Sequence, residues 1–497
     1  MECTRGVSAL SVQASEGGAC SDVQVAARTS LLSLNELLAA TGGALVMGCT
    51  EDEFCFTSVA TDSRSAVAGG MFIPLVGEFQ DGHSYIPAAL QQGATVVLIN
   101  KSFAATSLDV VKGWHSEYPS TSFIAVDHTM YGLQAAAAAY VKKFPQLISI
   151  GITGSSGKTT TKEILASILS TRYQVVMNQG NLNSETGLPL SVFQIRPHHQ
   201  VGVFELGMNR RGEMAEIAGV LSPKLGVITN IGTAHIGILG SRDAIAQEKK
   251  EIFSNFTSDS IAFIPEMDSY KDFLKEGVAG KSVEYGPSMV TSVSTLGLDG
   301  VSFQFEGITM TLPLPGKVNF YNALAGLAVA REMGLSPEEM KRGLESVKPL
   351  FGRSQVIRGD VTYIQDCYNA NPDSMETALE FFSDLELAAG RKVLVIGDML
   401  ELGAASAAAH LQAIAQAKKT GAQLMIFLGE AMAQAACETR DFGSQRAVSF
   451  PGKDERTIGE VVAILSEYLQ KDDVIFLKAS RGMGLERITT ALRGVEA

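Results

Sequence analysis

The chain has 497 residues, which at about 150 residues per domain suggests roughly three domains and excludes a lone small module. Its 53 acidic and 40 basic side chains give a formal net charge of −13, and such an acidic surface disfavours nucleic acid and anionic membranes as partners. No apolar run reaches the about 18 residues that a membrane helix needs. An anionic ligand must therefore be held by a local group of donors.

The six cysteines are too few to cross-link a chain of this length, and none forms a Cys-x-x-Cys pair. We therefore expect buried, reduced thiols in a cytosolic protein rather than zinc sites or disulfides.

The chain begins with a segment, residues 1–27, that is rich in Ser, Gly and Ala and has no continuous apolar stretch. This composition predicts a flexible leader rather than a secretory signal, and arginine is too sparse to favour a transit peptide. Three globular segments follow, and we expect an N-terminal domain over residues 28–145, a central domain over 146–348 and a C-terminal domain over 349–497.

The central segment opens on a strand, a loop and a helix. The apolar run 147–150 leads into a loop of Gly, Ser and Thr, and apolar residues then recur at helical spacing over 164–169. Further short apolar runs, 201–204 and 225–229, are separated by helix-like sequence. This pattern predicts a mainly parallel α/β sheet.

The C-terminal segment repeats the alternation of strand and helix. Its short apolar runs lie at 361–364, 393–396, 424–428 and 474–477, and an Ala-rich helical stretch covers 404–419. We expect a Rossmann-like, doubly wound domain here. The fold class predicted for the whole chain is α/β, with a smaller α/β domain at the N-terminus.

The loop after the first central strand has the composition of a phosphate-binding loop. Its backbone N–H groups are expected to converge at the positive end of the following helix, where a polyphosphate fits. Lys158 can reach the terminal phosphates and the Thr159 hydroxyl can bind Mg²⁺. Only two residues separate the two glycines, so this is a shortened variant of the common loop. The loop consists of Gly154, Ser155, Ser156, Gly157, Lys158, Thr159 and Thr160.

Polar residues follow the next two strands. Glu205 comes at the carboxyl end of the run 201–204, where an acid can complete a Mg²⁺ shell begun by Thr159. His235 ends a small-residue loop after the run 225–229, and spacing alone leaves both a ligand and a structural role open. Lys249 lies on a helix predicted to start near Arg242, in a cluster that by itself reads as a solvated charged face.

These motifs together resemble the Mur ligase family of peptidoglycan synthesis, whose members are ATP-dependent enzymes that form amide bonds. The resemblance extends from Thr61 nearly to the C-terminus, and it rests on residues 154–160, 205–207, 230–235, 315–316, 319, 322 and 352–353. Within the family, the segments 61–64, 72–74, 77–83, 366–374 and 397–403 resemble the members that add D-alanyl-D-alanine to UDP-N-acetylmuramoyl-tripeptide through an acyl phosphate.

The resemblance implies that ATP is held by the phosphate loop, with Asn322 at the adenine and Arg353 at the γ-phosphate. It also implies two Mg²⁺ ions, of which Thr159 and Glu205 hold the first and His235 and Lys249 face the second. Family members carry the lysine at the position of Lys249 as a carbamate. Lys250 replaces the usual Gly here and adds a positive charge, so the modification stays open. The expected catalytic residues are Lys158, His235, Lys249 and Arg353.

The remaining substrates are assigned in the same way. The uridine nucleotide sugar is expected on the N-terminal domain, and the dipeptide on the C-terminal domain at Asn369 and Asn371. Val318 stands where the family pattern has His, and Ala479 where it has Gly. The residues implied for the nucleotide sugar are Asp62, Ser63, Arg64, Asp81 and His83.

The alternatives are other ATP-using proteins. The nearest is another ligase of the superfamily, one that adds a single amino acid to a muramoyl peptide or glutamate to folate. A GTPase would need an Asn-Lys-x-Asp motif, which the sequence lacks, and a small-molecule kinase would release no free phosphate. We expect a cytoplasmic monomer that acts on small molecules.

Overall fold

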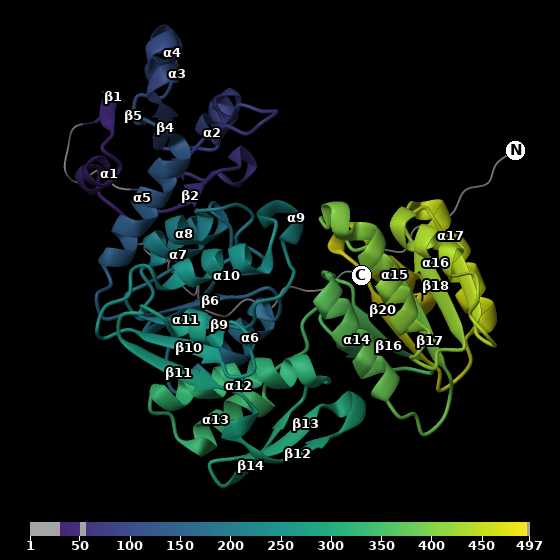
Figure 1. The fold of residues 1–497 in the computed structure, drawn as a ribbon. Coiled ribbons are helices and arrows are strands. Elements are labelled where there is room, and N and C mark those ends of the chain that lie inside the picture. The colour runs from purple at the N-terminus through teal and green to yellow at the C-terminus, as the bar shows by residue number, and fades with distance from the viewer. Residues whose placement is uncertain (1–29, 50–55, 495–497) are drawn as a thin grey trace, which may run out of the picture.

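The computed structural model describes residues 30–49 and 56–494, which form three larger sheets with their helices and one small sheet (Figure 1). The expected α/β fold class is confirmed. The predicted leader, residues 1–27, lies outside the described residues. Within the described ranges, no helix combines the length and the apolar character required to cross a membrane.

The first sheet has the order β1-β5-β4-β3-β2, and only β1 is antiparallel to its neighbour. Its strands are β1 (Ala44–Met47), β2 (Val59–Ala60), β3 (Met71–Phe72), β4 (Val96–Asn100) and β5 (Ser122–Val126). The helices of this segment are α1 (Leu34–Thr41), α2 (Ile86–Gln91), α3 (Lys101–Thr106), α4 (Leu108–Glu117) and α5 (Thr129–Lys142).

Helix α5 connects this segment to the central one. The hydroxyl of Tyr140 on α5 donates to the backbone carbonyl of Ile195 at 2.6 Å, and both residues are buried. A single apolar core therefore extends from beneath the first sheet into the central segment.

The central sheet is entirely parallel, with the order β11-β10-β9-β6-β8-β7. Its strands are β6 (Ile148–Thr153), β7 (Val175–Met177), β8 (Val201–Glu205), β9 (Leu225–Ile228), β10 (Ile261–Pro265) and β11 (Lys281–Tyr285). The helices are α6 (Lys158–Leu169), α7 (Gly187–Val192), α8 (Glu213–Leu221), α9 (Ile236–Leu239), α10 (Arg242–Lys250), α11 (Lys271–Lys275), α12 (Lys317–Glu332) and α13 (Pro337–Glu345). Because the strands are parallel, the residues that follow β6, β8 and β9 meet at one edge.

A small antiparallel sheet follows, made of β12 (Thr291–Thr295), β13 (Val301–Phe305) and β14 (Ile308–Leu312). Its inward residues Phe303 and Met310 join the core that also contains α6 and α12.

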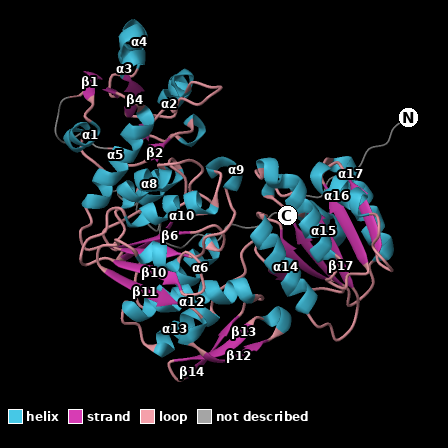
Figure 2. Ribbon diagram, viewed as in Figure 1, coloured by secondary structure: helices cyan, strands magenta, loops and turns pink. Residues whose placement is uncertain are grey.

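The C-terminal sheet has the order β15-β16-β20-β17-β18-β19, and only β15 is antiparallel. Its strands are β15 (Gln355–Ile357), β16 (Thr362–Asp366), β17 (Lys392–Gly397), β18 (Leu424–Leu428), β19 (Arg446–Phe450) and β20 (Val474–Lys478). Helices cover both faces (Figure 2), namely α14 (Pro372–Asp384), α15 (Ser406–Ala417), α16 (Glu430–Thr439), α17 (Glu455–Tyr468) and α18 (Glu486–Arg493).

The central strand of this sheet shows why its apolar run is continuous. Leu394 and Ile396 of β17 enter one buried core, and Val393 and Val395 enter the core on the other face. Alternate side chains of a strand point to opposite faces, so burial on both faces requires an uninterrupted apolar run.

Two expectations need correction. The helix expected over 404–419 begins later, because Gly403–Ala405 form a separate 3₁₀ turn before α15.

Cys367 is buried, as expected, and burial raises the pKa of its thiol to about 12, helped by nearby Glu486 and Asp366. Cys437 is exposed on α16, so the expectation of buried thiols is wrong there.

Candidate active site

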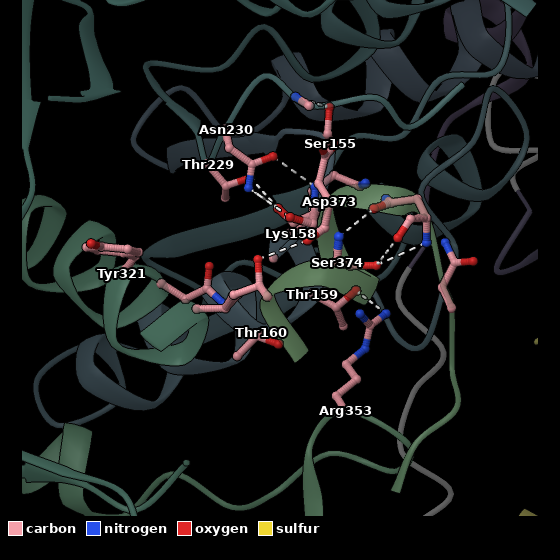
Figure 3. A pocket seen from close by; sticks show the side chains of 18 of the residues that line it. Ser155, Lys158, Thr159, Thr160, Thr229, Asn230, Tyr321, Arg353, Asp373 and Ser374 are labelled. Carbon is pink, nitrogen blue, oxygen red and sulfur yellow. Dashed lines mark hydrogen bonds between the residues drawn. The ribbon is translucent and has the colours of Figure 1, made fainter. Parts of the chain in front are cut away.

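A cavity of about 670 Å³ opens between the strand ends of the central sheet and the start of α14 (Figure 3). One wall is formed by residues 155–160 of the phosphate loop and the start of α6. The opposite wall comes from the C-terminal segment and includes Arg353, Asp366, Asn369, Asn371 and Asp373. Thr159 and Arg353, which are 194 positions apart in the chain, thus face one space.

The phosphate loop has the predicted order of strand, loop and helix. Gly157 caps α6 with φ +81°, and a Cβ at this position would collide with the side chain of Asn322. Since glycine offers no side-chain acceptor, no side chain caps the first turn of α6. The first backbone N–H groups of α6 are therefore available to donate to a bound anion.

Lys158 is the first residue of α6, and its ammonium donates to the backbone carbonyl of Gly154 at 3.0 Å. Burial lowers the pKa of Lys158; Glu205 opposes this shift and Arg353 adds to it. A phosphate brought to the loop supplies the missing negative charge.

Thr159 links the two walls. Its hydroxyl donates to the Glu205 carboxylate at 2.7 Å and accepts a bond from the Arg353 guanidinium at 2.7 Å (Figure 3). The guanidinium also stacks on Tyr368, with its carbon 4.1 Å from the ring centroid. Arg353 thus reaches from the C-terminal segment to the phosphate loop.

Two asparagines that the sequence analysis missed hold Glu205. Asn183 donates to its second carboxylate oxygen at 2.6 Å, and the Asn178 side chain accepts from its backbone N–H at 2.9 Å. Glu205 is 3% exposed, so these bonds replace water around a buried charge. The polar run 178–183 after β7 is the signal that could have indicated them.

His235 and Lys249 form the inner part of the site. His235 has a left-handed backbone, with φ +67°, and its Nδ1 is buried without a partner. Burial, aided by Lys249 and Lys158, lowers the pKa of His235 to about 4, so the imidazole is neutral. Lys249 is buried near the cavity rather than in its lining, and burial together with Lys158 holds its pKa well below the usual value.

The neighbours of Lys249 on α10 face elsewhere. The buried carboxylate of Glu248 accepts from the backbone N–H groups of Gly212 and Met214 at 2.9 Å, which fixes α10 against the start of α8. Lys250 donates to the backbone carbonyl of Phe273 at 2.6 Å and lies over that ring. The charge of Lys250 is therefore directed away from the site, although the sequence suggested that it would add positive charge next to Lys249.

On the opposite wall, the two asparagines expected at the dipeptide differ. The Asn369 side chain is exposed and accepts from the backbone N–H of Ala370. Asn371 is buried and caps α14, because its side-chain oxygen accepts from the Ser374 N–H at 2.9 Å. Beside them, buried Lys478 pairs with Asp366 at 2.6 Å, an interaction that the sequence analysis did not identify.

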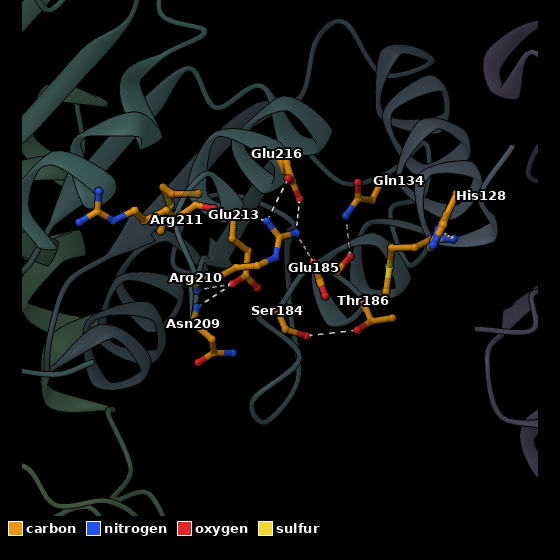
Figure 4. Close-up of polar contacts among 12 residues, drawn as sticks. His128, Gln134, Ser184, Glu185, Thr186, Asn209, Arg210, Arg211, Glu213 and Glu216 are labelled. Carbon is orange, nitrogen blue, oxygen red and sulfur yellow. Dashed lines mark hydrogen bonds and ion pairs between the residues drawn. The ribbon is translucent and has the colours of Figure 1, made fainter. Parts of the chain in front are cut away.

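A second polar cluster fixes the wall near Asn209, which lines the cavity (Figure 4). The Arg210 guanidinium donates to Glu216 and to Glu185, each at 2.6 Å, and these carboxylates raise its pKa. Glu213 accepts from the backbone N–H of Asn209 at 2.6 Å. The loop between β8 and α8 is thereby tied to Glu185, just before the start of α7.

The residues expected at the nucleotide sugar lie outside this cavity. Asp62 pairs with Arg64 at 2.6 Å, and the bonds from Arg64 lower the pKa of Asp62 to about 2, while Ser63 is buried. His83 is also buried: its Nδ1 bonds Asp81 at 2.6 Å and its Nε2 accepts from the Asn100 N–H. Both ring nitrogens of His83 are engaged, so the side chain supports its loop, and its expected contact with the nucleotide sugar stays a prediction.

The described residues contain no group of three or more His, Cys, Asp and Glu side chains placed to hold a metal by themselves. The Thr159 hydroxyl and the Glu205 carboxylate lie 2.7 Å apart, and His235, whose Nδ1 has no partner, lines the same cavity. Such a set fits Mg²⁺ only when phosphate oxygens supply further ligands.

Comparison with known proteins identifies the family. Residues 152–330 match the Mur ligase middle domain, and residues 352–481 match the Mur ligase glutamate ligase domain. The chain is 44% identical over 466 residues to the UDP-N-acetylmuramoyl-tripeptide--D-alanyl-D-alanine ligase of Treponema pallidum, covering 93% of this chain and 99% of that protein. The chain belongs to the Mur ligase family.

Solved structures agree with this assignment. MurF from Acinetobacter baumannii matches with a TM-score of 0.81 and 28% identity over 93% of this chain and 99% of that one. MurF from Thermotoga maritima in complex with ADP matches with a TM-score of 0.73 and 25% identity over 88% and 97%. The resemblance inferred from the sequence motifs of this Mur ligase is confirmed.

Proposed function

We propose that this Mur ligase joins D-alanyl-D-alanine to UDP-N-acetylmuramoyl-tripeptide at the expense of ATP. One observation carries the proposal: the phosphate loop and the residues expected at the dipeptide line the same cavity from opposite sides. The name of the 44% identical relative supports the choice of substrates over a single amino acid or folate.

The first step activates the tripeptide carboxylate. A carboxylate is a poor acyl donor, so transfer of the γ-phosphoryl group to its oxygen creates an acyl phosphate with a stable leaving group. Two anions must meet, and their repulsion amounts to several kcal/mol at short range unless cations intervene. Lys158 and Arg353 supply fixed positive charge at the phosphate loop.

Two Mg²⁺ ions are expected to complete this charge. Thr159 and Glu205 would hold the first ion, because the hydroxyl and the carboxylate lie 2.7 Å apart at the end of the loop. His235 would face the second, since its buried Nδ1 has no other partner. The ions would neutralise phosphate charge and orient the triphosphate.

Lys249 suits the carbamate that family members carry. Reaction with CO₂ requires a neutral amine, and burial favours that form of Lys249. Lys250 points away toward Phe273, so it adds little repulsion. The carbamate would turn a buried neutral amine into an anion beside His235.

In the second step, the amine of the dipeptide attacks the acyl carbon and phosphate leaves. Asn369 and Asn371 are proposed to seat the dipeptide on the cavity wall formed by the C-terminal segment. Enclosure between the two walls excludes water, which would otherwise hydrolyse the acyl phosphate.

The other assignments follow the same scheme. Residues 28–145 would bind the uridine nucleotide sugar, and residues 146–348 would bind ATP, with Asn322 at the adenine. The residues proposed for the nucleotide sugar are Asp62, Ser63, Arg64, Asp81 and His83. Residues 349–497 would bind the dipeptide. We propose a monomer that acts in the cytoplasm, where ATP and the nucleotide sugar are found.

Phosphate release tests the proposal. The enzyme is supplied with ATP, Mg²⁺ and UDP-N-acetylmuramoyl-tripeptide, and D-alanyl-D-alanine is compared with single amino acids and glutamate. We expect ADP and phosphate to form in step with the amide product only with the dipeptide. Equal release with glutamate would contradict the substrate assignment, and ADP without phosphate would indicate a kinase.

A further inference from the structure

A single carboxylate joins the two walls of the cavity at a point that the mechanism above does not use. Asp373, the second residue of α14, accepts from the Thr233 backbone N–H at 2.5 Å and from the Thr233 hydroxyl at 2.7 Å, both with the same oxygen. The partners are 140 positions apart in the chain. Two hydrogen bonds to an ionised oxygen are stronger than bonds between neutral groups.

The Thr233 side of this contact leads directly to the phosphate loop. Its neighbour Gly232 donates its N–H to the Ser155 hydroxyl at 2.8 Å, and the Asn230 side chain accepts from the Ser156 N–H at 3.1 Å. His235 lies two residues after Thr233 in the same loop. A shift of the loop 230–235 therefore moves the cradle and the imidazole together.

The Asp373 side leads to the expected dipeptide site. Asn371 caps α14 two residues before Asp373, and its backbone N–H donates to the Ser374 hydroxyl at 3.0 Å. This capped first turn holds Asn371 and Asp373 as one unit. A ligand seated against Asn371 thus acts on the carboxylate that contacts Thr233.

Gly232 shows how close the two segments come. A Cβ at this position would collide with the Asp373 carboxylate, although the Gly232 backbone is not in the left-handed region. A side chain at position 232 would therefore have to displace the Asp373 carboxylate, and its Cβ would also lie 3.2 Å from the Ser155 Cβ.

We propose that Asp373 is a positioning residue that couples dipeptide binding to the phosphate loop through Thr233. The inference rests on the proposed function, because it takes the dipeptide to bind at Asn369 and Asn371. Asp373 holds the loop 230–235 in the arrangement that receives the triphosphate. The dipeptide and the nucleotide then strengthen each other's binding by the same factor.

Binding measurements without turnover test the coupling. The affinity for a non-hydrolysable ATP analogue is measured with UDP-N-acetylmuramoyl-tripeptide present, with and without D-alanyl-D-alanine. We expect the dipeptide to tighten analogue binding about 10-fold in the wild type and less than about twofold in Asp373→Ala. The matched control is Glu376→Ala, because Glu376 is an acid on the same helix whose side chain forms no hydrogen bond or ion pair with the described residues. This variant should behave as wild type. Retained coupling in Asp373→Ala overturns the proposal.

A double-mutant cycle separates the contact from a general defect in α14. Gly232→Ala should reduce the coupling as Asp373→Ala does. Its effect should be smaller in the Asp373→Ala background, because the colliding carboxylate is gone and only the contact with the Ser155 Cβ at 3.2 Å remains. An undiminished effect of Gly232→Ala in that background overturns the proposal. Thr233→Val keeps the backbone donor but loses the hydroxyl, so it should lose part of the coupling. This variant tests the same contact if Asp373→Ala fails to fold.

Kinetics give a second readout. Asp373→Ala should raise the KM for the dipeptide and lower kcat, with the KM for the nucleotide sugar unchanged; equal changes in both KM values would contradict the coupling. If the wild-type enzyme neither forms the amide product nor shows coupling between the dipeptide and the ATP analogue, the proposed function itself is refuted. A wild type that ligates without coupling, or a variant that keeps it, would refute only the role of Asp373.

Discussion

Replacing Arg353 by alanine should impair turnover far more than substrate binding. The guanidinium reaches from the C-terminal segment to within 2.7 Å of the Thr159 hydroxyl, at the end of the phosphate cradle. It is also held over the Tyr368 ring at 4.1 Å. In the proposed mechanism, its charge lies where negative charge develops during phosphoryl transfer, and it reaches this place only when the two segments are together.

The magnitude follows from these contacts. A hydrogen bond from a charged donor contributes about 1.5–3 kcal/mol, and the aromatic stack adds about 0.5–2 kcal/mol. Loss of about 2–5 kcal/mol at the transition state corresponds to a fall in kcat of about 30- to 5,000-fold. The KM for the nucleotide sugar should change less than about twofold, because that ligand is assigned to residues 28–145.

Steady-state phosphate release, with each substrate varied in turn, measures these constants. Arg353→Lys keeps the charge but loses the planar fork, so it should recover only part of kcat. Arg456→Ala, on an exposed i,i+4 pair with Glu460, controls for the loss of one positive charge. A kcat equal to wild type in Arg353→Ala, or a rise confined to the KM for the nucleotide sugar, would refute the reasoning.

Three further outcomes are expected. Glu205→Gln should raise the Mg²⁺ concentration for half-maximal activity at least about 10-fold, because a neutral amide is a weaker ligand than a carboxylate; a Mg²⁺ titration measures this. Lys250→Ala should leave kcat within about twofold of wild type, since its ammonium points to a backbone carbonyl on α11. Tyr140→Phe should lower stability by about 1 kcal/mol in urea unfolding, because Ile195 loses one bond but keeps that of Arg196 at 2.7 Å.

Each of these has an outcome that would count against it. An unchanged Mg²⁺ requirement would remove Glu205 from the metal site. A large fall in kcat for Lys250→Ala would mean that its charge acts on the site after all. A Tyr140→Phe protein as stable as wild type would show that the buried hydroxyl contributes nothing net to the packing of α5.

Local features of this protein were readable from the sequence. The strands β8, β18 and β20 lie within one residue of the apolar runs that predicted them, because a strand buried on both faces needs an uninterrupted apolar run. The phosphate loop was readable for the same reason, since its strand, glycines, lysine and helix are adjacent in the chain. Nothing distant is needed to form such a unit.

The assembly of the site was decided by the tertiary structure. Asn183 holds Glu205 across 22 positions of the chain, Arg353 meets Thr159 across 194 and Asp373 meets Thr233 across 140. Periodicity and spacing describe neighbours along the chain, so they cannot indicate which distant side chains will pair. Burial of Lys249 likewise depends on how α10 packs, and this packing turned a lysine in an apparently solvated cluster into a buried amine.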